Sequence, residues 1–67
     1  IEFEKAKKDY RLTKRELEVV TMIYQGLSNR EISEKICVSE HTVKDHIKNI
    51  MRKMKADSRS KTIASLR

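Results

Sequence analysis

The chain of 67 residues contains no proline, no tryptophan, one glycine and one cysteine. A single cysteine excludes an internal disulfide and a multi-cysteine metal site, and it suits a reducing compartment such as the cytoplasm. No apolar run approaches the length that spans a membrane, so we expect no membrane partner. Because glycine and proline are almost absent, capping side chains must mark most of the helix boundaries.

Positive charge is concentrated in the second half of the chain. The net charge is +6, and residues 1–38 carry eight basic and seven acidic groups, whereas residues 39–67 carry eight basic and three acidic groups. This surplus fits a polyanionic partner such as a nucleic acid. A merely solubilising surface would have a similar composition, so charge alone leaves both interpretations open.

Apolar residues recur at helical spacing and never alternate, which predicts an all-α fold of four helices. We expect residues 1–11 to be a linker or frayed N-terminal tail, and residues 12–67 to form the domain. Gly26 predicts a left-handed helix end. The predicted helix starts are two capping boxes and two single caps: Thr13 with Glu16, Ser28 with Glu31, Ser39, and Asp57 or Ser58.

The predicted helix over residues 40–54 has two different sides. Its apolar residues form one stripe: Val43, Ile47, Ile50, Met51 and Met54. A short helix and a tight turn precede it, an arrangement typical of the helix-turn-helix that places its second helix in the DNA major groove. Asp45 and Lys48 lie away from the stripe, and Lys44 lies on one flank of it. Lysine can donate to guanine O6 and N7, and aspartate can accept from cytosine N4.

Three linked motifs carry a resemblance to a known family. The segments LTKRELEVV (residues 12–20), GLSNREI (26–32) and VSEHTVKDH (38–46) resemble the LuxR-type (GerE-like) DNA-binding domain, and KMKADSR (53–59) continues the resemblance. The run from Thr42 to His46 is most similar to the response-regulator (NarL/FixJ) branch. The resemblance implies a bacterial transcriptional regulator that binds double-stranded promoter DNA as a homodimer. The chain would then be a fragment of a larger regulator or a stand-alone one, with RNA polymerase as a further candidate partner.

The resemblance also assigns roles to individual positions. It implies base contacts by Lys44, Asp45 and Lys48, and it places an apolar dimer interface on the last helix. Phosphate contacts are expected from Arg15, Ser39 and Thr42, and by charge and position from Lys53 and Arg59. The expected dimer residues are Thr62, Ile63 and Leu66, although the same residues could instead close the core of the monomer.

Asp45 departs from the uncharged residue that many family members have there, and we expect it to tune sequence choice. His46 flanks the apolar stripe and is predicted to be a structural histidine. Two other functions remain open, a promoter-binding domain like sigma-factor region 4 and a basic helical module that binds an acidic protein. No nucleophile–base pair, cofactor loop or metal-ligand spacing is present in the sequence, so we expect no enzyme activity, cofactor or metal.

Overall fold

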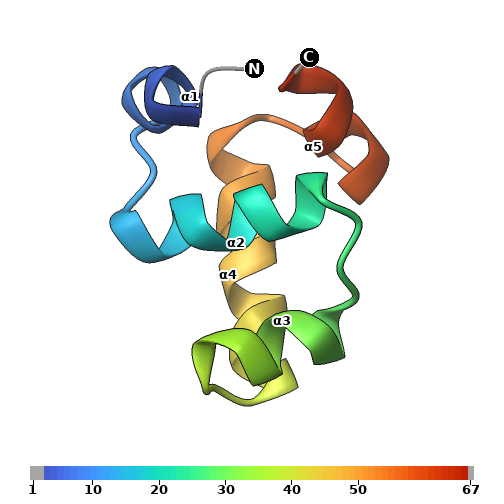
Figure 1. Ribbon diagram of the computed structural model, residues 1–67. Coiled ribbons are helices and arrows are strands. Elements are labelled where there is room, and N and C mark those ends of the chain that lie inside the picture. Colours follow the sequence, from blue (N-terminus) through green and yellow to red (C-terminus); the bar gives the residue numbers. More distant parts are fainter. Residues whose placement is uncertain (1–2, 67) are drawn as a thin grey trace.

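The computed structural model describes residues 3–66, which form five helices and no strand. The all-α fold class predicted from the sequence is therefore confirmed, with one helix more than expected. Figure 1 shows α2 crossing α4, α3 beside the N-terminal half of α4, and α1 and α5 at the opposite end of the molecule. The helices are α1 (Phe3–Tyr10), α2 (Lys14–Tyr24), α3 (Asn29–Ile36), α4 (Glu40–Lys53) and α5 (Arg59–Ser65).

The additional helix is α1, which replaces most of the predicted linker or frayed tail over residues 1–11. Its Ala6 is buried in the core, and the ring of Phe3 packs edge-on against Tyr24 with the ring centroids 5.6 Å apart. The charge-rich composition conceals a small apolar face, because Phe3, Ala6 and Tyr10 lie at helical spacing. Burial of that face against the rest of the domain stabilises α1; residues 1–2 lie outside the described part of the chain.

The core is built around α4, whose apolar stripe is buried between α2 and α3. Val43 and Ile50 are completely inaccessible to solvent, and Ile47 and Met54 are nearly so. Met51 lies at the margin and is only partly buried. The residues of α2 and α3 in the same core are Val19, Val20, Ile23, Ile32 and Ile36. The stripe predicted from helical spacing is thus the central element of the packing.

The predicted capping boxes are present at the starts of α2 and α3. The N–H of Glu16 donates to the Thr13 hydroxyl at 3.1 Å, and the N–H of Thr13 donates to the Glu16 carboxylate at 2.9 Å. Ser28 and Glu31 exchange the same pair of hydrogen bonds at 3.2 and 2.9 Å. Each box satisfies two backbone donors that the first turn of a helix leaves without intrahelical partners.

Four helices end with a left-handed residue followed by an apolar one. The left-handed residues are Arg11, Gly26, Cys37 and Lys55, with φ between 54° and 90°. In each case the next residue donates its N–H to a carbonyl five positions earlier, the bond that defines a Schellman motif. The four bonds, between 2.9 and 3.1 Å, are Leu12 to Lys7, Leu27 to Met22, Val38 to Ser33 and Ala56 to Met51. The sequence predicts this ending only at Gly26.

Within residues 3–66, no helix combines the length and the apolar character needed to cross a membrane.

The packing of α1 can be tested with the substitution Ala6→Asp. Because this side chain is only 8% exposed, a carboxylate there should lower the free energy of unfolding by about 1–3 kcal/mol. Urea denaturation followed by circular dichroism measures the change. Lys5→Asp, at an exposed position of the same helix, is the control and should have a much smaller effect. Equal effects at the two positions would show that α1 does not pack.

Candidate nucleic-acid interface

The turn between α3 and α4 is fixed by hydrogen bonds at both of its ends. Cys37 is left-handed, and its N–H donates to the carbonyl of Ser33 at the end of α3. Ser39 caps α4, since its hydroxyl accepts the N–H of Thr42 at 3.1 Å. Together with the close packing of α3 on α4, these bonds set the angle at which α4 leaves the turn. The structure therefore contains the helix-turn-helix arrangement predicted from the sequence.

The exposed side of α4 carries the three residues predicted to contact bases. Lys44, Asp45 and Lys48 are all exposed, and the neighbouring Val43 and Ile47 are buried on the opposite side. The structure thus brings the three together within residues 44–48 of α4. Two donors and one acceptor on adjacent turns match the hydrogen-bonding groups that base edges present in the major groove.

His41 lies beside Asp45 on this surface. Its Nε2 lies 3.6 Å from Asp45 Oδ2, with both side chains largely exposed. The two residues are one helical turn apart on α4, the spacing at which helix side chains are neighbours. His46 is half-buried at the margin of the apolar stripe, where the sequence predicts a structural role.

Three of the predicted phosphate contacts lie at helix N-termini. The hydroxyls of Ser39 and Thr42 are 3.0 Å apart at the start of α4. Arg15 is exposed in the first turn of α2, and its Nη1 donates to Glu18 Oε2 at 3.0 Å. An exposed pair of this kind stabilises the fold by at most about 1 kcal/mol, so it leaves the guanidinium free to exchange partners.

The other two predicted phosphate contacts bind protein acceptors that are distant in the chain. Lys53 Nζ lies 2.6 Å from Glu16 Oε1 and 3.3 Å from the carbonyl oxygen of Arg11. Arg59 donates from Nη1 to Asn29 Oδ1 at 3.0 Å and from Nη2 to the carbonyl of Leu27. Lys53 is the last residue of α4 and Arg59 is the first residue of α5, so neither lies in the segment 44–48 that carries the predicted base contacts.

Glu16 is the one buried charge in this part of the core, with a residue exposure of 5%. Its burial raises the pKa of the carboxyl, but the hydrogen bonds from Lys53 and Thr13 and the charge of Lys53 outweigh burial. The pKa of Glu16 is consequently held below its ordinary value. Glu31, which is exposed, has a lowered pKa because the N–H and hydroxyl of Ser28 bind its carboxylate.

Two of the three residues predicted for a dimer interface are buried in the protomer, which is the alternative that the sequence left open. Thr62 is only 1% exposed and Leu66 only 6%, so both side chains belong to the core of the protomer. The Thr62 hydroxyl donates to the carbonyl of Ser58 at 3.1 Å within α5. A short helix that closes the core over α2 must bury one side, and residues 62 and 66 share that side. Only Ile63, which is half-buried, remains accessible to a partner.

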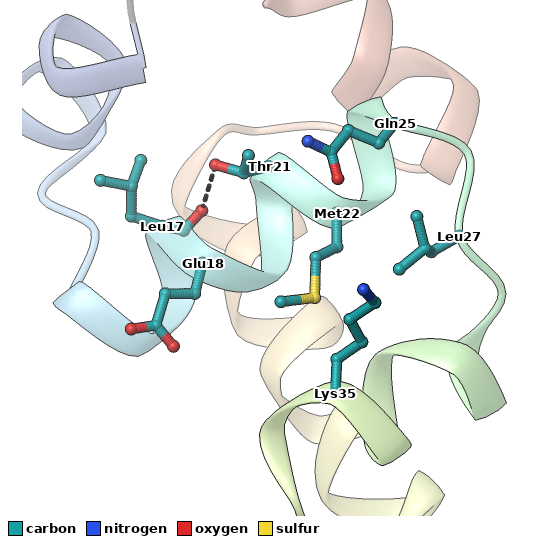
Figure 2. A pocket seen from close by; sticks show the side chains of 7 residues that line it. All are labelled: Leu17, Glu18, Thr21, Met22, Gln25, Leu27 and Lys35. Carbon is teal, nitrogen blue, oxygen red and sulfur yellow. Dashed lines mark hydrogen bonds between the residues drawn. The ribbon is translucent and has the colours of Figure 1, made fainter.

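A groove of about 410 Å³ lies between α2 and α3. Figure 2 shows Leu17, Met22 and Leu27 on its walls, with Lys35 reaching in from α3. The Thr21 hydroxyl in this groove donates to the carbonyl of Leu17 at 2.8 Å. None of the predicted DNA-contact residues lines the groove. Among residues 3–66, no three His, Cys, Asp or Glu side chains cluster in a way that could hold a metal ion.

Comparison with known proteins gives a consistent result. The model of the family described as bacterial regulatory proteins, luxR family, matches residues 10–66. The transcriptional regulatory protein DegU of Brevibacillus brevis is 44% identical over 52 residues, which are 78% of this chain and 22% of that protein. The nitrate/nitrite response regulator protein NarP of Escherichia coli is 50% identical over 48 residues, covering 72% and 22%.

The spore germination protein GerE of Bacillus subtilis is 40% identical over 55 residues, covering 82% of this chain and 74% of that protein. The chain therefore spans under a quarter of the length of DegU and NarP but most of the length of GerE. No solved structure gives a significant match.

The lowered pKa of Glu16 predicts how stability depends on pH. A carboxyl whose pKa is lower in the folded state stabilises the fold above its unfolded pKa of about 4.3, and this contribution is lost as the pH falls through the folded pKa. The free energy of unfolding, measured in urea, should therefore be lower at pH 3 than at pH 7. The decrease should be smaller in Glu16→Gln and unchanged in the exposed control Glu4→Gln. Because Glu31 also has a lowered pKa and is present in both variants, part of the dependence of stability on pH will remain in each of them. An identical decrease in Glu16→Gln and the wild type would refute this origin.

Proposed function

Because this chain belongs to the luxR family of bacterial regulatory proteins, we propose that α4 enters the DNA major groove and reads base edges there. The function of the domain is sequence-specific binding of double-stranded DNA in transcription regulation, and the family is not an enzyme family. Membership of this family favours that function over a sigma-factor domain or a protein-binding module. The observation that carries the proposal is the two-sided character of α4, buried at Val43 and Ile47 and exposed at Lys44, Asp45 and Lys48.

Each exposed residue of α4 has a distinct role in this proposal. Lys44 and Lys48 donate to guanine O6 and N7, and Asp45 accepts from the amino group of cytosine. Ser39 and Thr42 lie where the positive end of the α4 dipole attracts a phosphate. Arg15 forms a second phosphate contact at the start of α2, exchanging its exposed partner Glu18 for the DNA backbone.

The assembly and context of the protein are also part of the proposal. We place the protein in the cytoplasm, as a response regulator that binds DNA as a homodimer and contacts RNA polymerase at promoters. With Thr62 and Leu66 buried, the dimer contact would be made by Ile63 and the exposed side of α5, including Ala64. Pairing on adjacent half-sites raises affinity through effective concentration, without further contacts to DNA.

The function is tested by binding to duplex DNA at several salt concentrations. A selected site should bind with a log K that falls by about 0.9 per neutralised phosphate for each unit of log salt. Lys48→Ala should weaken binding to that site by about 1–3 kcal/mol and binding to random duplex much less. Lys5→Ala, an exposed change on α1 at the far end of the molecule, is the control. No binding at low salt, or binding insensitive to salt, would contradict the proposal.

The role of Asp45 is tested by selecting sites from a randomised duplex library. Asp45→Ala should lose the preference for cytosine at one position of the half-site, because no acceptor remains for its amino group. Affinity for random duplex should rise, since an acidic group near the phosphates has been removed. Glu40→Ala removes an exposed acid from the start of the same helix and should leave the selected sequence unchanged. If Asp45→Ala selects the same sites with the same affinity, Asp45 does not read DNA.

A further inference from the structure

We propose that Lys53 and Arg59 are positioning residues that hold the N-terminal ends of α2 and α3, and that neither neutralises a DNA phosphate. This inference rests on the proposed DNA-binding function and deepens it, because it separates the cations that contact DNA from those that orient the reading helix. The sequence predicts both residues as phosphate contacts from their charge and position, whereas their contacts within the protein indicate a different role.

Lys53 joins three segments of the chain at the last turn of α4. Its Nζ is 2.6 Å from Glu16 Oε1 and 3.3 Å from the carbonyl oxygen of Arg11. Glu16 Oε1 also accepts the N–H of Thr13 at the start of α2. The lysine side chain is 29% exposed and the glutamate side chain 6%. Movement of Lys53 to a phosphate would remove the cationic partner of a buried carboxylate, which is unfavourable.

Arg59 performs the equivalent task for α3. From the first turn of α5, its guanidinium donates to Asn29 Oδ1 and to the carbonyl of Leu27. These acceptors flank Ser28, the residue that caps α3. The forked geometry of arginine lets one side chain bind both acceptors, which the single ammonium of lysine cannot reproduce.

The two contacts bear directly on the orientation of α4. The helices that they hold at their N-terminal ends, α2 and α3, are the two that pack most extensively against α4. If either helix could tilt, the exposed side of α4 would no longer meet base edges at a fixed angle. Base contacts need accurate geometry, whereas non-specific binding depends on charge. Loss of positioning should therefore reduce the preference for the selected site more than binding to random duplex.

The first test compares charge removal with loss of geometry. Lys53→Met should reduce the ratio of specific to random binding by about tenfold and leave the salt dependence of log K at the wild-type slope. Arg59→Lys keeps the charge but not the fork, and it should reduce the same ratio. If the two residues were phosphate contacts, Lys53→Met would weaken both duplexes alike and reduce the slope by about 0.9, and Arg59→Lys would have little effect.

The second test is a rescue within the Lys53–Glu16 pair. Glu16→Gln keeps an N3 side chain that can complete the capping box but removes the buried charge. The double variant Glu16→Gln with Lys53→Met should therefore recover much of the specificity lost in Lys53→Met alone. A phosphate contact predicts no recovery, because the lysine is absent in both variants. The matched control is Lys55→Met, an exposed change two residues away, which should keep the wild-type specificity ratio.

Folding is monitored by circular dichroism so that each comparison uses folded protein. If Lys53→Met alone is unfolded, the double variant replaces it, and its salt slope decides between the two roles. If the wild type does not bind duplex DNA, the proposed function itself fails. If the wild type binds and the variants reduce the slope without changing the specificity ratio, only the positioning role is overturned.

Discussion

The structure depends on the burial of one side of α4. This helix of 14 residues supplies the apolar stripe on which α2 and α3 pack, and no other helix contacts both as extensively. A helix that buries one side must expose the other, so the packing that stabilises the domain also determines which residues of α4 face outward. The buried residues Val43 and Ile47 are therefore each followed in the chain by exposed residues, which are Lys44, Asp45 and Lys48.

Features encoded within one helical turn were predictable from the sequence, and features that join distant segments were not. The capping boxes need only residues three positions apart, and the stripe of α4 needs only helical spacing. The contacts of Lys53 and Arg59 join residues 30 to 42 positions apart, so no local pattern indicates them. The helix α1 was missed because its apolar face is small and its composition is rich in charge.

The exposed position of Lys44, Asp45 and Lys48 was predictable from the sequence, whereas the protein partners of Lys53 and Arg59 were not. The exposed residues of α4 follow from periodicity, because burial of the stripe fixes their direction. The cations at the ends of α4 and α5 could not be sorted in this way, since lysine and arginine serve equally well at a surface or against a buried acceptor. Lys53 and Arg59 are counted in the positive charge of residues 39–67, although both bind oxygens of residues that lie 30 to 42 positions away in the chain.

The left-handed helix ends have a consequence for how such a domain can change. Arg11, Cys37 and Lys55 hold a backbone conformation that is unfavourable for residues with a Cβ by about 1–2 kcal/mol each. All three are exposed, and none belongs to the stripe or the outward side of α4. Exchange of any of them for glycine or asparagine would relieve strain without altering the core or the exposed residues of α4. The thermal stability of the domain can therefore be changed at these positions without a change in the residues that α4 exposes.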